Sequence, residues 1–336
     1  MKAIGYRQPL PITDANALLD LDLPAPTPGA RDLLVRVKAV SVNPVDAKVR
    51  KSAAPEAGQA RVLGFDAVGI VEALGAEAKN FKVGDRVFYA GSITRPGTNA
   101  ELHAVDERIV GHAPESLSDA DAAALPLTAI TAWELLFDRL QVPQGGGAGE
   151  SLLIVGGAGG VGSILIQLAR QLTALRVVAT ASRPATRDWC LQLGAHDVID
   201  HSKPLAAELQ ALGLPQVDRV ASLTQTDVHF DQIVEALKPQ GQLALIDDPK
   251  TLDATKLKRK ALSLHWELMF TRPIFGTPDM HLQGQLLNEV ARLVDAKRIR
   301  TTANASFGTI NAANLKKAHA LIESGTAQGK VVLEGF

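Results

Sequence analysis

The 336-residue sequence predicts an α/β protein in which a parallel, doubly wound sheet follows a β-rich segment. Three observations support this fold class. Residues 1–125 contain short apolar runs separated by glycine and proline. From residue 151 onwards strand-like and helix-like runs alternate, which is typical of a parallel sheet with helices on its faces. At 151–170 an apolar run ends abruptly in glycines and then continues at helical spacing.

The β-rich segment is expected to form a small barrel. Apolar residues partly alternate over 33–42, which predicts a long strand. Glycines punctuate 62–75, so strands there are expected to bend or to pass close to other backbone. Residues 83–88 indicate a turn into another strand. Short strands joined by glycine and proline turns are typical of small barrels.

Later elements follow from changes in periodicity. Residues 120–137 are apolar at helical spacing but are interrupted by Pro126, so two short helices are predicted, with 122–129 as an interdomain hinge. Beyond about residue 263 the alternation stops, and the remaining tail is too small for a domain, so we expect it to complete the N-terminal one. The other predicted elements are strands at 176–180, 198–200, 217–222, 241–246 and 330–333, and helices at 185–193, 230–237, 281–295 and 311–324.

The glycines after the run 151–155 form a known ligand-binding pattern. Gly157, Gly159 and Gly162 give G-x-G-x-x-G between a predicted strand and a predicted helix. The first glycine permits the turn, the second admits a pyrophosphate, and the third lets helix and strand pack closely. The alternative is a glycine-rich turn without a ligand. We predict a dinucleotide site formed by Gly157, Ala158, Gly159, Gly160, Val161 and Gly162.

Composition restricts the other possibilities. A net charge of −1 gives no electrostatic basis for binding nucleic acid or a membrane surface. No apolar run reaches the roughly 18 residues of a membrane helix. The start of the chain lacks the apolar core of a signal peptide. The single cysteine, Cys190, permits neither an internal disulfide nor a cysteine-built zinc lobe. These features predict a cytoplasmic protein.

The residues after the second strand predict which nicotinamide cofactor binds. An NAD site requires a carboxylate about 20 residues past the glycines, where it holds the ribose 2′-hydroxyl. Here Ser182 and Arg183 occupy that region, and Arg187 follows. Arginine binds phosphate oxygens in a bidentate manner, so the pattern favours NADPH. The alternative is that both arginines are solvated residues at the start of a surface helix.

Five segments occur in a fixed order along the chain. They are Val-Asn-Pro-Val-Asp at 42–46, Gly-Phe-Asp-Ala-Val-Gly at 64–69, Gly-Asp-Arg-Val at 84–87, and the stretches 124–133 and 180–190. Together they resemble the zinc-free, quinone oxidoreductase-like branch of the medium-chain dehydrogenase/reductase superfamily, in particular a bacterial subgroup labelled zinc-type alcohol dehydrogenase-like. The resemblance implies a GroES-like catalytic domain at 1–124, completed by 271–336, and a Rossmann NADP-binding domain at 125–270.

The zinc in that label can be tested against the residues present. Zinc-dependent members have a Cys in the first loop and a His-Glu pair in the second motif. In this chain the first loop, 43–46, contains no Cys, and Phe65-Asp66 stands in place of the His-Glu pair. Asp46, Asp66, His103 and His112 are the remaining possible ligands. Scattered His and Asp residues are usually solvated or structural. We therefore predict no metal site.

Without zinc, the developing charge at a plain ketone lacks a Lewis acid. A quinone or an α,β-unsaturated carbonyl delocalises that charge itself, and the protein then supplies positioning and hydrogen bonds. The sequence therefore predicts an NADPH-dependent quinone or enone reductase. The alternatives are a zinc-dependent alcohol dehydrogenase or ketone reductase, and a non-catalytic NADPH-binding sensor.

The remaining site residues come from strand ends and from the resemblance. The resemblance places Asn43 and Asp46 near the nicotinamide, and Tyr89 is a candidate proton donor or else a buried anchor. It also implies a homodimer formed through an edge strand of the Rossmann sheet. Further predicted cofactor residues are Thr131, His201, Leu223, Ile246 and Lys330, and the predicted substrate residues are Phe65, Phe270 and Arg272.

Overall fold

The computed structural model describes all 336 residues, and the chain divides into two compact units. The first comprises 1–130 and 270–336, and the second comprises 131–269. The chain therefore crosses between the units twice, after residue 130 and after residue 269. The boundaries expected from the sequence lie a few residues away. Helix α3 (Pro126–Trp133) spans the first crossing, and Phe270 belongs to the first unit.

The second unit is built on six parallel strands in the order β11-β10-β9-β12-β13-β14. If β9 is counted as the first strand, this is the 3-2-1-4-5-6 order of doubly wound dinucleotide-binding sheets. The order reverses between β9 and β12, which is where such sheets bind ligands. The elements are the π-helix η2 (Glu134–Arg139), β9 (Ser151–Val155), α4 (Gly160–Leu172), β10 (Arg176–Thr180), α5 (Pro184–Gln192), β11 (Asp197–Ile199), α6 (Leu205–Ala211), β12 (Val217–Ser222), α7 (Thr226–Ala236), β13 (Leu237–Leu245), η3 (Ala254–Lys260) and β14 (Ser263–Trp266).

Both faces of this sheet are covered. All five residues of β9 are buried, as expected for a central parallel strand. Leu153 and Val155 belong to the core that α6 and α7 share with the sheet. Because side chains alternate along a strand, the equally buried Leu152 and Ile154 face the opposite side.

The edge strand β14 was not predicted, because the sequence pattern changes at its first residue. Its four residues pair in parallel with β13, from Gln242↔Ser263 to Leu245↔Trp266. None of the four side chains is fully buried. An edge strand does not need the continuous apolar run that identifies a buried parallel strand, so the periodicity gives little signal here.

The first unit contains a seven-stranded sheet in the order β15-β16-β3-β5-β6-β8, with β7 also paired to β3, and a three-stranded sheet β2-β1-β4. The long β3 is central and is antiparallel to β16, β5 and β7. The elements are β1 (Lys2–Tyr6), β2 (Leu19–Asp22), β3 (Asp32–Val42), α1 (Pro44–Ser52), β4 (Arg61–Val62), β5 (Ala67–Leu74), β6 (Arg86–Tyr89), β7 (Leu102–Asp106), η1 (Glu107–Ile109), β8 (Val110–His112), α2 (Asp119–Ala123), α8 (Thr271–Phe275), α9 (Leu282–Asp295), β15 (Ala303–Ser306), α10 (Ala312–Glu323) and β16 (Lys330–Glu334).

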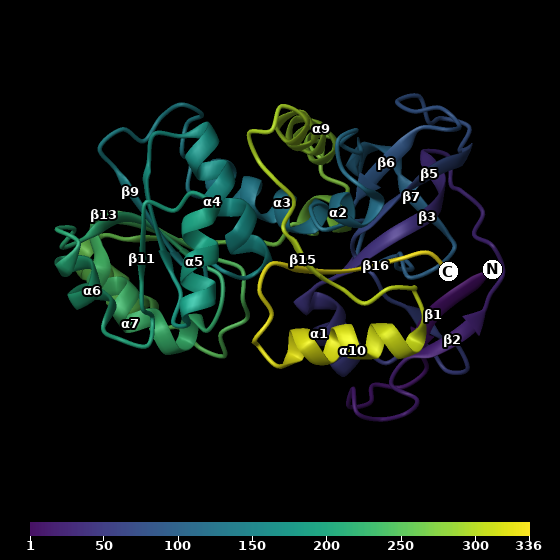
Figure 1. Cartoon of the computed structure of the whole chain (residues 1–336), viewed down its shortest axis with the longest axis horizontal. Helices are drawn as coiled ribbons and strands as arrows, with labels where there is room; N and C mark the ends of the chain where they lie inside the picture. The colour runs from purple at the N-terminus through teal and green to yellow at the C-terminus, as the bar shows by residue number, and fades with distance from the viewer. The chain divides into compact units, whose positions relative to one another are not determined.

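The C-terminal tail returns to the first unit. Strand β16 pairs with β3, with Val331 opposite Val42, and α10 packs against α1 (Figure 1). Helix α9 contacts β8, and its Asn288 side chain accepts the backbone N–H of His112 at 2.8 Å. The end of the chain therefore supplies part of the sheet and part of the helical cover of the first unit.

One helical stretch, Asp119–Arg139, is long and apolar enough to cross a membrane by length and composition alone. Within its most apolar window, 78% is buried inside the protein. A core helix of a folded protein passes the same criterion, and the break at Pro126 expected from the sequence falls between α2 and α3.

Helix α4 lies against β9 at a distance that only glycine permits. A Cβ placed on Gly162 would lie 2.5 Å from the carbonyl oxygens of both Gly156 and Gly157. These are backbone atoms of the preceding turn and cannot rotate away. The third glycine of the motif is therefore required by the packing of helix on strand, independently of any ligand.

We predict that Gly162→Ala destabilises the second unit by about 2 kcal/mol, as overpacking of a rigid contact does. The measurement is the thermal or denaturant unfolding of purified protein. Gly159→Ala is the matched control, because the nearest atom to its added Cβ is the Gly156 carbonyl oxygen at 3.6 Å, an ordinary contact. Equal stability of the two variants would contradict the packing argument.

Candidate functional site

The glycine motif forms the turn from β9 into α4. Gly156 has a φ of +87°, which favours glycine, and the N–H of Gly157 donates to the carbonyl oxygen of Thr180 at 3.1 Å. A Cβ on Gly157 would meet Ala179 at 2.7 Å, so this glycine is also required by packing. Gly159 differs, because the fold leaves ordinary space around it. A glycine that the fold itself does not require is expected where a ligand approaches the backbone.

The end of β10 joins this turn through one hydroxyl. Thr180 Oγ1 accepts the N–H of Gly156 at 3.0 Å and lies 3.1 Å from Nδ1 of His201. Because the hydroxyl accepts from Gly156, its own proton is available to donate to His201. The ring of His201 is 6.0 Å from that of His229 in an edge-to-face arrangement. Thr180 therefore links the glycine turn to the loop that follows β11.

The three residues predicted to hold a ribose phosphate all lie beside this edge. Ser182 and Arg183 lie two and three residues after the end of β10, and both are exposed. Arg183 is the N-cap residue of α5, and Arg187 lies one turn later. The Nη1 of Arg187 donates to the carbonyl oxygen of Val198, which anchors the arginine to β11. The structure thus brings these residues together at the carboxyl end of β10.

The loops after β12 and β13 are fastened to each other. Asp247 accepts the N–H of Thr226 at 2.8 Å and also its hydroxyl, and Thr226 in turn lies 2.7 Å from the Ser222 hydroxyl. Gln225, between these loops, has a φ of +51°, which is uncommon for a residue with a side chain. The predicted cofactor residues Leu223 and Ile246 are half-buried at these two strand ends.

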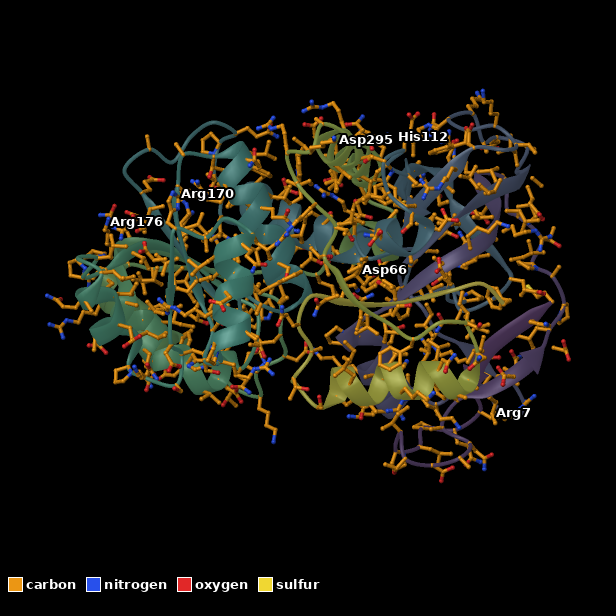
Figure 2. The ribbon with its side chains drawn as sticks, in the orientation of Figure 1. Arg7, Asp66, His112, Arg170, Arg176 and Asp295 are labelled. Carbon is orange, nitrogen blue, oxygen red and sulfur yellow. The ribbon has the colours of Figure 1, made fainter.

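In the first unit the residues of the motifs at 42–46 and 64–69 form a buried polar network around Asp66, which is labelled in Figure 2. Its Oδ2 accepts the Ser41 hydroxyl at 2.6 Å, the Asn43 amide at 2.7 Å and the Lys330 ammonium at 3.0 Å. Its Oδ1 accepts the backbone N–H of Leu127 at 2.7 Å. Lys330 also donates to the Asn43 side-chain oxygen and to the Val42 carbonyl. One buried carboxylate thus holds together β3, α3 and β16.

Asp46 has a separate role. Its two carboxylate oxygens accept the backbone N–H of Asn43 at 2.8 Å and that of Gly64 at 2.9 Å. Burial raises its pKa to about 7, although these hydrogen bonds and Lys330 act in the opposite direction. This geometry fixes the start of α1 against the Gly64 turn. The catalytic role of Asp46 stays a prediction, and its contacts support positioning.

Tyr89 is buried and bonded to His103. Nε2 of His103 donates to the Pro96 carbonyl at 2.9 Å, so in the neutral ring Nδ1 accepts the Tyr89 hydroxyl at 3.2 Å. Burial raises the pKa of Tyr89 and lowers that of His103 to about 4. The tyrosine proton therefore points to a neutral histidine. Proton donation by Tyr89 to a substrate stays a prediction.

The predicted substrate residues lie in the first unit. Phe65 and Phe270 are buried and pack edge to face with ring centroids 5.3 Å apart. Arg272 is buried and its Nε donates to Asp279 at 3.0 Å. Thr131, predicted for the cofactor, is the first residue of the second unit and is buried. The role of Phe65, Phe270 and Arg272 in substrate binding stays a prediction.

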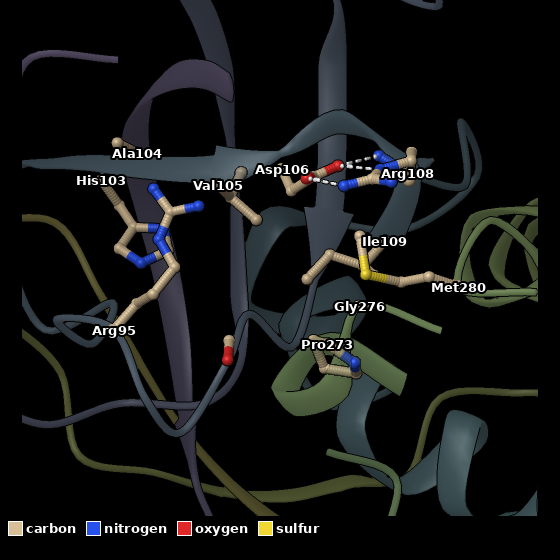
Figure 3. Close-up of a pocket in the computed structure, with 11 residues that line it drawn as sticks. Arg95, His103, Ala104, Val105, Asp106, Arg108, Ile109, Pro273, Gly276 and Met280 are labelled. Carbon is tan, nitrogen blue, oxygen red and sulfur yellow. Dashed lines mark hydrogen bonds and ion pairs between the residues drawn. The ribbon is translucent and has the colours of Figure 1, made fainter. Parts of the chain in front are cut away.

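A small cavity of about 110 Å³ lies elsewhere in the first unit, between β7, η1 and α8 (Figure 3). Its charged side chains are already paired, Arg95 with Asp32 at 2.6 Å and Arg108 with Asp106 at 2.7 Å. The cavity thus offers no unpaired charge, and we assign it no ligand.

Sequence reasoning missed several residues of these networks. Ser41 and the Leu127 backbone meet Asp66 only through the fold, and no local motif marks them. Thr180 ends a strand that the sequence predicts, but its link to Gly156 needed the parallel pairing of β9 and β10.

Comparison with known proteins gives matches along the chain. Residues 29–115 match the family described as alcohol dehydrogenase GroES-like domain, and residues 193–333 match the family described as zinc-binding dehydrogenase. A zinc-type alcohol dehydrogenase-like protein of Staphylococcus aureus strain MSSA476 is 39% identical over 99% of both chains. A quinone oxidoreductase of Pseudomonas aeruginosa is 31% identical over 91% of this chain and 92% of its own.

The solved structures agree with these matches. The structure of a Rhizobium etli protein described as a zinc-dependent alcohol dehydrogenase superposes on this chain with a TM-score of 0.96. The two sequences are 62% identical, and the match covers 100% of this chain and 98% of the other. The fold, the motif order and the relatives coincide over nearly the whole length. The chain belongs to the medium-chain dehydrogenase/reductase superfamily of oxidoreductases, with a GroES-like domain and a Rossmann domain.

Proposed function

We propose that this protein is an NADPH-dependent oxidoreductase that reduces a quinone or an α,β-unsaturated carbonyl without a metal ion. The observation that carries the proposal is the ammonium of Lys330 on Asp66 and Asn43. These two residues stand in the motifs where zinc-dependent relatives place ligands. Here a buried cation of the chain itself already neutralises the carboxylate.

The donor set supports the same conclusion. No group of three or more His, Cys, Asp or Glu side chains is arranged to hold a metal ion. A catalytic zinc requires three such ligands and an open position. Both the pairing of Asp66 and the absence of a ligand cluster therefore favour an acceptor that delocalises charge by its own conjugation.

The residues of the second unit fit NADPH. The ordinary space beside Gly159 and the free N-terminal turn of α4 suit a pyrophosphate. Ser182, Arg183 and Arg187 would hold the 2′-phosphate, and no carboxylate lies in 180–187 to repel it. His201, Leu223 and Ile246 would contact the other parts of the NADPH molecule. NADPH, when bound, supplies the hydride for the reduction.

In the first unit the chain would position and bond the acceptor. Asp46 fixes the start of α1 by accepting the backbone N–H of Asn43, and Lys330 and Asp66 orient the Asn43 side chain. Phe65 and Phe270 would contact the apolar part of the substrate, with Arg272 nearby in sequence. Such preorganisation is the usual contribution of a protein to hydride transfer. We further propose a cytoplasmic location.

We also propose that the protein is a homodimer formed along β14. This strand is one of the two edges of the Rossmann sheet; its last residue, Trp266, is 55% exposed, and Leu268 just after it is 51% exposed. Exposed apolar side chains on a free strand edge favour pairing with a second copy.

The cofactor prediction concerns Arg183. We expect kcat/KM for NADPH to exceed that for NADH, and Arg183→Ala to lose about tenfold for NADPH alone, because one charge-assisted contact to the 2′-phosphate is removed. Arg170→Ala is the control, since Arg170 lies at the far end of α4 and bonds His196. A wild-type preference for NADH, or an unchanged KM for NADPH in Arg183→Ala, would contradict the assignment.

The reaction prediction concerns metal and substrate. We expect NADPH oxidation with quinones and alkenals but not with simple ketones, at the same rate with and without a chelator. Metal analysis of the purified protein is expected to show no stoichiometric zinc. Zinc whose removal abolishes turnover would favour an alcohol dehydrogenase, and tight NADPH binding without turnover of any acceptor would favour a sensor.

The assembly prediction concerns Trp266. We expect light scattering to give twice the chain mass, and Trp266→Lys to weaken the dimer at least tenfold by placing a charge on the paired edge. Val228→Lys is the control, because Val228 is 66% exposed on α7 of the same unit. A monomeric wild-type protein would overturn this proposal without affecting the others.

A further inference from the structure

Two glutamates of the second unit are buried against each other. Glu134 and Glu267 are 0% and 2% exposed, and their carboxyl groups lie close enough to interact. Neither residue belongs to the glycine motif or to the network around Asp66. Arg139 donates its Nε to Glu267 Oε2 at 2.8 Å. The site therefore contains two carboxyl groups and one guanidinium group.

A hydrogen bond between two carboxyl groups requires a proton, because an ionised carboxylate only accepts. Two carboxylates in contact in a buried site cannot both ionise, so one proton is shared between them. Burial, together with the neighbouring charge of Glu134, raises the pKa of Glu267 to about 9, and Arg139 acts in the opposite direction. With one proton, the pair carries a single negative charge, which Arg139 balances.

The two glutamates lie next to the two points at which the chain crosses between the units. Glu134 is the fourth residue of the second unit, and Glu267 is its third-last residue. Glu134 begins the π-helix η2, a rare element that often marks functional sites, directly after the first crossing. Glu267 follows β14, and its N–H donates to the Leu245 carbonyl at 2.9 Å, directly before the second crossing.

We propose that the Glu134–Glu267 carboxyl pair, joined by one shared proton and balanced by Arg139, is a clamp that fastens together the two chain segments that cross between the units. Loss of that proton leaves two buried carboxylates facing one guanidinium. Their repulsion then loosens η2 from the end of β14. The crossings become more mobile, and the rest of the sheet does not.

Neighbouring charged groups are few. From β12, Arg219 donates to the carbonyl oxygen of Leu140 at the end of η2 at 3.2 Å and pairs with Glu150. Asp138 precedes Arg139 on η2, and His265 lies two residues before Glu267 on β14. The groups that act most strongly on Glu267 are Glu134 and Arg139. Because the folded state holds the proton more tightly than the unfolded chain, the contribution of the pair to stability is full below the ordinary glutamate pKa. It decreases as pH rises and is lost above about pH 9.

The first test detects the proton directly. Infrared difference spectra are recorded on the full-length protein from about pH 7 to about pH 11. We expect the carbonyl stretch of a protonated carboxylic acid at neutral pH, lost with a midpoint near pH 9. The same signal should be absent in Glu267→Gln, whereas Glu235→Gln, an exposed glutamate on α7 of the same unit, should retain it.

The second test measures the clamp. Hydrogen exchange is followed at about pH 7 and about pH 10, with labelling times scaled to the intrinsic rates. In the wild-type protein and in Glu235→Gln, protection of 131–140 and 262–269 should fall at least tenfold at the higher pH. In Glu267→Gln the neutral amide mimics the protonated acid, so the protection of these two segments should change less than twofold between the two pH values. Glu134→Gln serves as a second variant if Glu267→Gln does not fold.

Two outcomes would overturn the proposal. Absence of a carboxylic acid signal that is lost with a midpoint near pH 9 would show that no proton is shared, since the buried Asp46 titrates near pH 7. Equal pH dependence of protection in the wild type and in both glutamine variants would show that the pair does not hold the crossings together. Neither result depends on the cofactor or on turnover, so the proposed function is tested separately.

Discussion

The first unit depends on one buried ion pair. Lys330 and Asp66 are separated by 264 positions in the sequence, yet their charged atoms lie 3.0 Å apart in the interior. Burying either charge alone would cost several kcal/mol, so each residue is tolerable only in the presence of the other. The last strand is therefore fastened to the start of the chain by electrostatics as well as by the β16–β3 ladder. Asn43, which contacts both charges, is held in place as a consequence.

The glycines of the motif in the second unit are required for two different reasons, intramolecular packing and ligand approach. Gly157 and Gly162 are needed because neighbouring backbone or side-chain atoms leave no room for a Cβ. Gly159 is not needed for that reason, since its nearest neighbour lies at an ordinary contact distance. Intramolecular packing therefore explains two positions of the motif and leaves the third to be explained by a ligand. This distinction connects the sequence pattern to function more directly than the pattern itself does.

The sequence predicts the fold where local periodicity is strong and fails where contacts are distant. The alternation after residue 151 predicts a parallel sheet, and β10 begins and ends at the expected residues. β14 was missed because an edge strand of four residues carries no long apolar run. The Asp66 network was only partly visible, because its motif names Asp66 but not Ser41, which reaches it from β3. Glu134 and Glu267 were not singled out at all, since a charged residue in sequence is usually exposed, and only the fold shows that they are buried together.

The chain thus stabilises its buried carboxyl groups in two ways. Asp66 is paired with the Lys330 ammonium and accepts hydrogen bonds from Ser41, Asn43 and the Leu127 backbone. Glu267 has only Arg139 and a second carboxyl beside it, and a proton must supply the missing positive charge. This second arrangement depends on the proton concentration. It is the second that lies next to both crossings between the units, where a change in charge acts on the segments that connect them.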